Sequence, residues 1–291
     1  MSIASVTSRA GIQTAIAAAS RKTGIDFNYL LGQAQVESGL RADARAATSS
    51  ATGLYQFIEQ SWLGVIKDHG AEHGLGWAAD SIRQTASGRY IVSDPTTRRA
   101  ILDMRRDPGT AALMAAEHAS DNKAALEQRL DRPATGTDLY MAHFLGRAGA
   151  AKFLGAMERN PGQTGAALFP AAARANRGVF YAGDGQPRTL GEIYARFAGK
   201  LDQGAAAVGA TGLASDAVNA FATGLDDFSD TEVLLGNDAV DGDRHWIETT
   251  LAQLEATRGP TGTASGERLN PFRPTPETAK LAYLMLARLG A

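Results

Sequence analysis

The 291-residue sequence contains no cysteine. A disulfide framework, a thiol nucleophile and a metal site built from thiolates are therefore excluded. Aromatic residues make up only 7% of the chain, whereas alanine is abundant, and this balance favours helices packed through small side chains over a β-rich core. The longest apolar run, Leu281 to Ala287, is too short to cross a bilayer. We therefore expect a mainly α-helical protein without a membrane span.

Signals for targeting and for nucleic-acid binding are also lacking. The first 20 residues do not combine a basic start with a long apolar stretch, so they do not predict a Sec signal peptide. Lys and Arg are not densely clustered, which argues against a nucleic-acid surface. Residues 1–200 carry 23 basic and 18 acidic side chains, a net +5, and residues 201–291 carry 6 and 13, a net −7. The basic part suits an anionic polymer, although ordinary charge scatter gives the same balance.

Hydrophobic periodicity up to about residue 200 is that of helices separated by Gly- and Pro-rich turns. The pattern predicts a short strand at 89–92 and helices at about 11–22, 26–38, 54–67, 109–130, 170–176 and 190–201. Two further helices are expected to start at Asp94-Pro95 and near Asp138.

Beyond these helices, the Ala- and Gly-rich segment Gly204–Ser215 is interpreted as a linker. It is followed by an acidic stretch, a helix near 246–257, an extended segment at 259–276 and a closing amphipathic helix. The sequence thus predicts one helical domain over residues 1–203 and a smaller helical extension over residues 204–291.

One carboxylate stands at the end of an apolar helical stripe. Phe27, Leu30, Ala34 and Glu37 are spaced by three, four and three residues, so they share one side of a helix that Asp26 caps and Gly39 ends. Burial and the negative end of the helix dipole both disfavour a charged carboxylate there. Both effects raise the pKa of Glu37, as a general acid near neutral pH requires. Taken alone, the same residue is more often a solvated glutamate.

The context of Glu37 resembles the catalytic domain of soluble lytic transglycosylases, relatives of goose-type lysozyme. That family pairs Glu-Ser at a helix end with a downstream Ser-x-x-x-Gly-Leu-Met-Gln. Here Glu37-Ser38 is followed by Ser49 and by Gly53-Leu54-Tyr55-Gln56, with Tyr in place of Met. The resemblance covers about residues 10–200 and implies a lysozyme-like helical fold.

A third family segment, Ala-Tyr-Asn-x-Gly, matches Ala142-His143-Phe144-Leu145-Gly146 with two departures. His143 replaces Tyr and Phe144 replaces Asn. The chain therefore looks like a divergent branch of the kind found in phage-derived or specialised-secretion proteins that cleave the cell wall, and the departures put the sugar contacts of this segment in doubt.

The resemblance implies cleavage of the β-1,4 bond between N-acetylmuramic acid and N-acetylglucosamine in peptidoglycan. Glu37 would protonate the glycosidic oxygen and then, as a carboxylate, take the proton of the muramic 6-hydroxyl. The 6-oxygen closes onto the anomeric carbon and gives a 1,6-anhydro product. No metal or cofactor is implied.

Supporting residues follow from the same resemblance. Ser38 and Ser49 are expected to line the cleft and steady the glutamate, Tyr55 to line the sugar groove, and Gln56 to contact sugar or brace the site. A partly exposed helix residue is the alternative for Gln56.

Three more residues downstream are substrate-binding candidates. His143 could hydrogen-bond Glu37 or the substrate's N-acetyl group, and a satisfied core histidine is the even alternative. Tyr140 and Tyr194 are further candidates. The family has a late Tyr that approaches the acid, and Tyr194 lies at about that place in the sequence; core packing is equally plausible.

Other signals carry less weight. Asp43 is the carboxylate nearest in sequence and could be a second catalytic group, but a loop aspartate is more often a turn residue. His69 and His73 have the spacing of a metal pair, yet glycines interrupt their helix and no third ligand is near in sequence. Glu59 is expected to be solvated, and Glu117 to form a structural ion pair.

Two alternatives to a transglycosylase remain open: a hydrolytic muramidase, and a lysozyme-like domain kept for glycan binding or scaffolding with weak turnover. The substrate would place the protein in the periplasm or outside the cell, by a route other than an evident Sec signal. The C-terminal extension could bind a protein partner in envelope, secretion, flagellar or phage machinery, or could pack on the catalytic domain.

Overall fold

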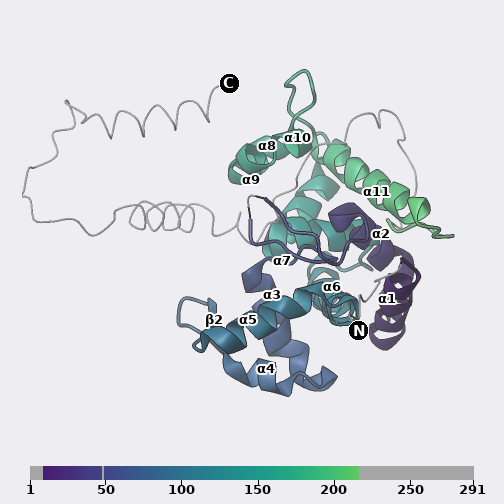
Figure 1. Ribbon diagram of the computed structural model, residues 1–291. Helices are drawn as coiled ribbons and strands as arrows, with labels where there is room; N and C mark the ends of the chain where they lie inside the picture. The colour runs from purple at the N-terminus through teal and green to yellow at the C-terminus, as the bar shows by residue number, and fades with distance from the viewer. Residues whose placement is uncertain (1–8, 48, 216–291) are drawn as a thin grey trace, which may run out of the picture. The chain divides into compact units, whose positions relative to one another are not determined.

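A computed structural model describes residues 9–47 and 49–215 (Figure 1). This part of the chain is mainly helical, which confirms the predicted fold class. The α-helices are α1 (Arg9–Thr23), α2 (Phe27–Ser38), α3 (Glu59–His69), α4 (Gly76–Ser81), α5 (Pro95–Asp103), α6 (Pro108–Leu130), α7 (Gly136–Arg159), α8 (Gly165–Leu168), α9 (Pro170–Ala175), α10 (Arg177–Phe180) and α11 (Leu190–Ala207). Short 3₁₀ turns occupy Gly70–His73 (η1) and Met104–Arg106 (η2).

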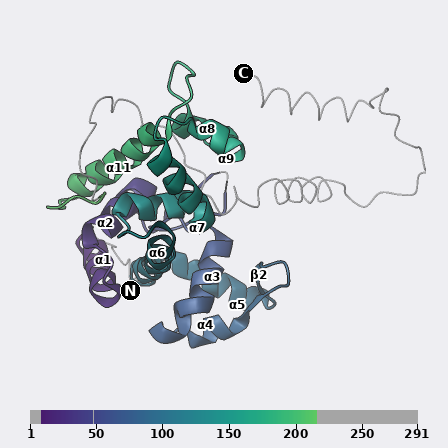
Figure 2. The same cartoon turned by 180° about the vertical axis from the view of Figure 1, so that it is seen from behind.

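Helix α6 runs through the centre of the helical unit. It packs against α1 on one side and α7 on another, while α11 packs against both α2 and α7. Helices α3, α4 and α5 gather with β2 on one side of α6, and α8, α9 and α10 lie on the other (Figure 1 and Figure 2). Strands β1 (Ile82–Gln84) and β2 (Tyr90–Val92) form one antiparallel hairpin, so the predicted strand at 89–92 is confirmed within one residue.

Helix α2 begins and ends as its sequence predicts. The Asp26 carboxylate accepts a hydrogen bond from the Tyr29 amide at 2.8 Å, which satisfies one of the free amides of the first turn. Gly39 closes the helix in the left-handed conformation, with φ 62°. Gly32 lets α11 approach closely, because a Cβ there would lie 2.8 Å from the Leu201 carbonyl oxygen. The helix that carries Glu37 is thus held at both ends and along its length.

The segment before α3 differs from the prediction. A helix was expected from Leu54, but α3 begins at Glu59, and residues 51–57 form turns. Gly53 has φ 85° and Gln56 has φ 47°, values that a right-handed helix does not allow. The Arg105 guanidinium donates to the carbonyl oxygens of Ser50 and Phe57. Tertiary packing on Arg105 therefore overrides the helical pattern of this stretch.

Helix α7 begins with a capping box in which the side chains of Thr135 and Asp138 each accept from the other's backbone amide. It is kinked at Gly146, where φ is 71° and ψ is 163°. Glycine is the residue that adopts such angles without strain. The two halves of the helix consequently differ in direction, and the kink falls four residues after the Ala142 of the family-like segment.

The interpretation of Gly204–Ser215 as a linker is wrong. Helix α11 continues to Ala207, and Ala214 and Ser215 are buried. The Asp202 carboxylate accepts from the Ser215 amide at 2.9 Å and from its hydroxyl at 2.7 Å. The small side chains that suggested flexibility instead allow close packing. The elements expected after residue 215 lie outside the described residues, so the extension over residues 204–291 stays a prediction there.

In the part of the chain that the structure describes, no helix combines the length and apolarity needed to cross a membrane.

Candidate functional site

Glu37 lies in the last turn of α2, on the face that Leu30 and Ala34 bury in the core. Its side chain is only 6% exposed. A carboxylate that loses its water in this way needs compensating hydrogen bonds or a nearby cation to stay charged.

One hydrogen bond reaches Glu37 from α7. The Tyr140 hydroxyl donates to Oε1 of Glu37 at 2.7 Å, and Nε2 of His143 lies 3.7 Å from the same oxygen. The rings of Tyr140 and His143 are stacked, with their centroids 5.9 Å apart. Since both residues lie in one turn of α7, this helix positions the two polar groups that face the acid.

The electrostatic balance at Glu37 favours its protonated form. Burial raises the pKa of Glu37, and this effect outweighs the Lys200 ammonium and the Tyr140 hydrogen bond, which both lower that pKa. Burial also lowers the pKa of Lys200 below its ordinary value. Burial also lowers the pKa of His143 to about 4, so this imidazole is neutral at pH 7 and supplies no counter-charge. Glu37 can therefore hold a proton at a pH where an exposed glutamate has lost it.

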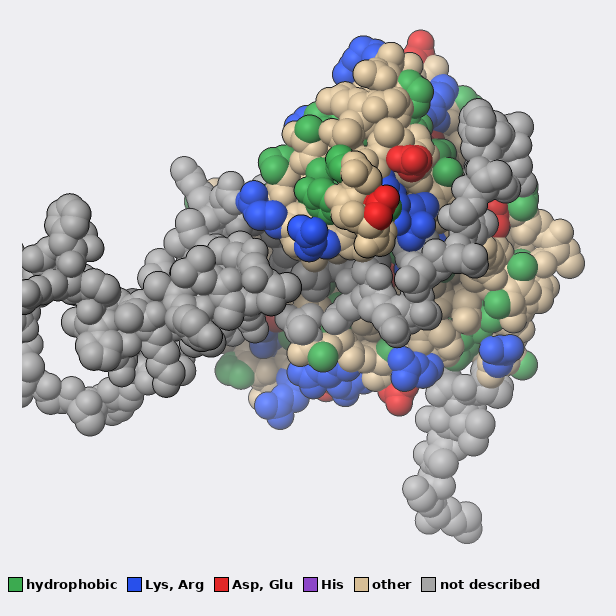
Figure 3. Space-filling view, turned by 90° about the horizontal axis from the view of Figure 1, so that it is seen from above, with side chains coloured by type: hydrophobic (Ala, Val, Ile, Leu, Met, Phe, Trp, Pro, Cys, Tyr) green, Lys and Arg blue, Asp and Glu red, His purple; other side chains and the backbone are tan. Residues whose placement is uncertain are grey.

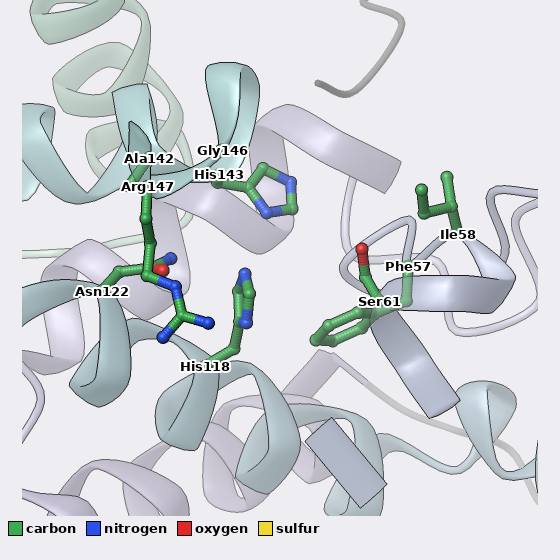
Figure 4. Close-up of a pocket in the computed structure, with 9 residues that line it drawn as sticks. All are labelled: Phe57, Ile58, Ser61, His118, Asn122, Ala142, His143, Gly146 and Arg147. Carbon is green, nitrogen blue, oxygen red and sulfur yellow. The ribbon is translucent and has the colours of Figure 1, made fainter. Parts of the chain in front are cut away.

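His143 also lines a pocket of about 80 Å³ (Figure 4). Helix α6 contributes His118 and Asn122, and the kinked part of α7 contributes His143 and Arg147. The remaining lining residues are Phe57, Ile58, Ser61, Ala142 and Gly146. Two imidazoles thus enter one pocket from two different helices, and Figure 4 shows the Arg147 guanidinium beside His118.

Two polar atoms of this pocket have no hydrogen-bond partner among the described residues. They are Oδ1 of Asn122, whose residue is 2% exposed, and Nε2 of His143. Burial lowers the pKa of His118 to about 4, so both pocket imidazoles are neutral at pH 7. Buried polar atoms in native proteins are nearly always paired, so these two are unsatisfied polar groups of the residues that line the pocket.

Ser38 and Gln56, two of the predicted site residues, tie α2 to the turns that follow it. The Ser38 hydroxyl donates to the Leu54 carbonyl at 2.8 Å and accepts from the Arg41 amide at 3.1 Å. The Gln56 carboxamide donates to the Gly53 carbonyl at 2.8 Å, and Gln56 is buried. Both side chains therefore brace the loop around the acid, one of the two roles considered for Gln56.

Ser49 and Tyr55 do not reach Glu37 through any contact seen in the described chain. The Ser49 hydroxyl accepts from the Ala51 amide at 3.2 Å within its own turn. The Tyr55 ring is 1% exposed, which differs from the open groove position expected for it. Its hydroxyl has no hydrogen-bond partner among the described residues.

The two candidate tyrosines have separate partners. Tyr140 meets Glu37, whereas the Tyr194 hydroxyl lies 2.8 Å from the Thr135 hydroxyl and donates to Oδ1 of Asp138 at 3.0 Å. Tyr140 therefore lies beside the acid, whereas Tyr194, which the resemblance placed near it, bonds to Thr135 and Asp138 instead.

The minor candidates form contacts of their own. Asp43 is exposed. Glu59, which was expected to be solvated, is partly buried and paired with Arg98.

Glu117 lies 2.7 Å from Nε2 of His73 and 3.7 Å from Nδ1 of His69, and Nε2 of His69 lies 3.0 Å from Asp121. These contacts join the α3–η1 region to α6 and give Glu117 the structural pairing expected for it. Within residues 9–47 and 49–215, no group of three His, Cys, Asp or Glu side chains has an arrangement suited to a metal ion.

Comparison of the chain with known protein families finds none that matches.

Proposed function

We propose that this protein is a peptidoglycan lytic transglycosylase in which Glu37 is the catalytic acid. The observation that carries the proposal is a carboxyl group with 6% exposure, a raised pKa and a tyrosine hydroxyl at 2.7 Å. A general acid needs a proton at working pH and a fixed direction in which to deliver it. Burial provides the first and Tyr140 the second.

In this mechanism Glu37 gives its proton to the glycosidic oxygen, which leaves as the 4-hydroxyl of N-acetylglucosamine. The N-acetyl group of the muramic residue stabilises positive charge at the anomeric carbon. The Glu37 carboxylate then takes the proton of the 6-hydroxyl while the 6-oxygen bonds to that carbon. The proton returns to Glu37, no water is consumed, and the products are a 1,6-anhydro sugar and a free sugar end.

The choice of transglycosylation over two-carboxylate hydrolysis comes from the sequence resemblance. The groups known to act on Glu37 are a tyrosine, a neutral histidine and a lysine. Hydrolytic glycosidases use a second carboxylate about 5 to 9 Å away as nucleophile or base, and the product analysis below distinguishes the two reactions.

The test is product analysis on purified murein sacculi with the full chain, its Glu37→Gln variant and the control Asp43→Asn, which removes an exposed carboxylate. We expect the unmodified chain and the control to release 1,6-anhydro sugars, and Glu37→Gln to release none. Products heavier by one water would establish a muramidase instead. Glycan binding without products from the unmodified chain would establish the scaffold alternative.

The proposed substrate implies a periplasmic or extracellular place of action. Peptidoglycan strands would be the main partner, and a protein partner for residues 216–291 is a further proposal that rests on sequence alone. Where the uncovered surface is visible in Figure 3, basic and acidic side chains are interspersed. Recognition of the polymer is therefore expected to depend on the site beside Glu37 more than on a broad field of one sign.

A further inference from the structure

We propose that Asp202 is a positioning residue for the proposed acid, because it holds the segment 212–215 between the helix of Glu37 and the helix of Tyr140. We call this segment the strap. The inference rests on the proposed function, since it names what keeps the Tyr140 hydroxyl on the acid. It predicts that a substitution at Asp202 changes the titration of Glu37 through the strap and Tyr140.

The first argument is the way in which Asp202 holds the strap. Its Oδ1 accepts from the amides of Ala214 at 2.8 Å and Ser215 at 2.9 Å, and its Oδ2 accepts from the Ser215 hydroxyl at 2.7 Å. Hydrogen bonds to a carboxylate are stronger than those between neutral groups. Asp202 lies in α11, two residues after Lys200. The strap is therefore anchored on the helix whose lysine acts on Glu37.

The second argument is the bond between the strap and the start of α7. The Ser215 carbonyl accepts from both the amide and the hydroxyl of Thr137, each at 3.2 Å. Amides of the first helical turn have no partner within the helix, so the strap satisfies one of them. Thr137 and Tyr140 are three residues apart and share one side of α7. The strap thus fixes the turn of α7 from which Tyr140 bonds to Glu37.

The third argument is close packing against both helices. A Cβ at Gly32 of α2 would lie 3.0 Å from the Ala214 Cβ, and a Cβ at Gly136 of α7 would overlap the Ala214 carbonyl oxygen. Two glycines therefore leave the space that the strap fills. Ala214 and Ser215 are buried there. Because protein interiors are close-packed and transmit strain, the strap sets how closely α2 and α7 approach each other.

The strap differs in this respect from the other contacts at the start of α7. The Tyr194 hydroxyl bonds to Thr135 and Asp138, and Arg132 pairs with Asp138. These contacts join α7 to α11 and to the loop before α7. The strap also packs on α2, the helix of the acid. Its loss, unlike that of the Tyr194 hydroxyl, is therefore expected to alter the hydrogen bond to the acid.

The experiment follows the titration of Glu37 directly by NMR. Full-length protein is labelled with carbon-13 at the side-chain carboxyl groups of glutamate, and the Glu37 signal is identified by its absence from Glu37→Gln. Its chemical shift against pH gives the pKa without any substrate. Asp202→Ala removes the anchor of the strap. Asp202→Asn removes only the charge, since the amide oxygen can accept from both backbone amides and the amide nitrogen can donate to the Ser215 hydroxyl.

We expect Asp202→Ala to raise the pKa of Glu37, because the carboxylate loses the Tyr140 hydrogen bond that lowers this pKa. The upward shift should be at least about half of the shift in Tyr140→Phe, and it should disappear when both substitutions are combined. Removal of a negative charge alone would lower the pKa of Glu37. Asp202→Asn should accordingly leave this pKa unchanged or slightly lowered.

Two further variants separate positioning from a general loss of stability. Thr137→Val nearly keeps the shape of the side chain and removes its hydroxyl bond to Ser215, so it should raise the pKa of Glu37 by a smaller amount. Asp94→Ala is the matched control. Asp94 also accepts from an amide and a hydroxyl, both of Thr97, but at the start of α5. Its loss should leave the pKa of Glu37 unchanged.

An unchanged or lowered pKa of Glu37 in Asp202→Ala overturns the inference. An equal upward shift in Asp202→Asn, or one that persists in the Tyr140→Phe background, also overturns it. If Asp202→Ala does not fold, Thr137→Val is judged by its shift with and without Tyr140. Wall digestion that survives Glu37→Gln overturns the proposed function but leaves these titrations readable, so the two failures are distinguishable.

Discussion

Two buried carboxylates in this molecule each accept a hydrogen bond from a tyrosine, yet their surroundings differ in charge. Glu37 accepts from Tyr140 at 2.7 Å and has 6% exposure, whereas Asp138 accepts from Tyr194 at 3.0 Å and is fully buried. Asp138 also has the Arg132 guanidinium at 2.6 Å. The two sites therefore differ in the positively charged group that faces the carboxyl group.

An arginine remains charged in any protein environment, so Asp138 has a permanent counter-ion. Beside Glu37 the His143 imidazole is neutral at pH 7, and the Lys200 ammonium lowers the pKa of Glu37 by less than burial raises it. The comparison teaches that a buried carboxylate bonded to an arginine is structural, while one whose burial outweighs the nearby cation has a raised pKa. Three pairs of variants test this contrast.

The largest effects are expected from the carboxylates themselves. Glu37→Gln should lower wall digestion by about 10³-fold, the contribution of general acid catalysis, and should leave the protein folded. Asp138→Asn should lower the free energy of unfolding by about 2 kcal/mol, because the fully buried Asp138 side chain loses its charge-assisted hydrogen bond to Arg132, although Arg132 is partly exposed and keeps Glu158 as a partner. The activity of both variants is measured as the initial rate of sacculus digestion, and their stability as the free energy of unfolding in urea. Similar losses of stability in the two variants would contradict the distinction between a structural carboxylate at Asp138 and a functional acid at Glu37.

The pH dependence of stability gives a second test of the raised pKa of Glu37. The pKa of Glu37 is raised in the folded state above its ordinary value of 4.5, so the folded protein binds this proton more tightly than the unfolded chain does. Stability linked to Glu37 therefore falls as pH rises from about 4.5 through the raised folded value. Glu37→Gln lacks this titration and should gain stability relative to the unmodified protein at pH 8, with little difference at pH 4. A constant difference between pH 4 and 8 would contradict the raised pKa.

The cations should give the next largest contrast. Arg132→Met should cost about 3 kcal/mol of unfolding free energy, since Asp138 then stays buried without its counter-ion. Lys200→Met should change stability by less than about 1 kcal/mol, because a buried lysine with a lowered pKa contributes little.

Removing the Lys200 ammonium should also raise the pKa of Glu37 further, because that ammonium lowers it. The alkaline limb of the pH–rate profile on sacculi should then move to higher pH. Lys22→Met, which removes an exposed lysine of α1, should leave the limb unchanged. An unchanged limb in Lys200→Met would show that the ammonium does not act on the acid.

Much of the fold could be predicted because its signals are local. Asp26 and Gly39 bound α2, Asp94 begins α5, and the spacing of Leu30, Ala34 and Glu37 correctly buries one face. The start of α3 could not be predicted in this way. It depends on the Arg105 guanidinium, which bonds to the preceding turn from 48 residues away in sequence.

The pocket shows the same limit. Sequence reasoning did not single out His118, Asn122 or Arg147. His118 and Asn122 nevertheless follow Ala111 and Ala115 at spacings of four, three and four, the same helical periodicity that drew attention to Glu37. The polar residues on the apolar stripe of α6 could therefore have been predicted to face the interior. The position of Arg147 could not have been predicted, because it depends on the kink at Gly146. Likewise, only tertiary structure could decide which of Tyr140 and Tyr194 meets the acid.

The smallest contrast is expected from the tyrosines. Tyr194→Phe should lower the free energy of unfolding by about 1 kcal/mol, the contribution of one hydrogen bond, without changing the activity of the folded protein. Tyr140→Phe removes a hydrogen bond that lowers the pKa of Glu37, so the alkaline limb should move to higher pH while the maximal rate falls by less than about tenfold. Sacculus digestion between pH 5 and 9, with thermal unfolding of the same samples, measures both variants. If Tyr194→Phe moved the alkaline limb and Tyr140→Phe did not, the group that sets the pH dependence would be the carboxyl bonded to Tyr194. Asp138, and not Glu37, would then be the candidate for the acid.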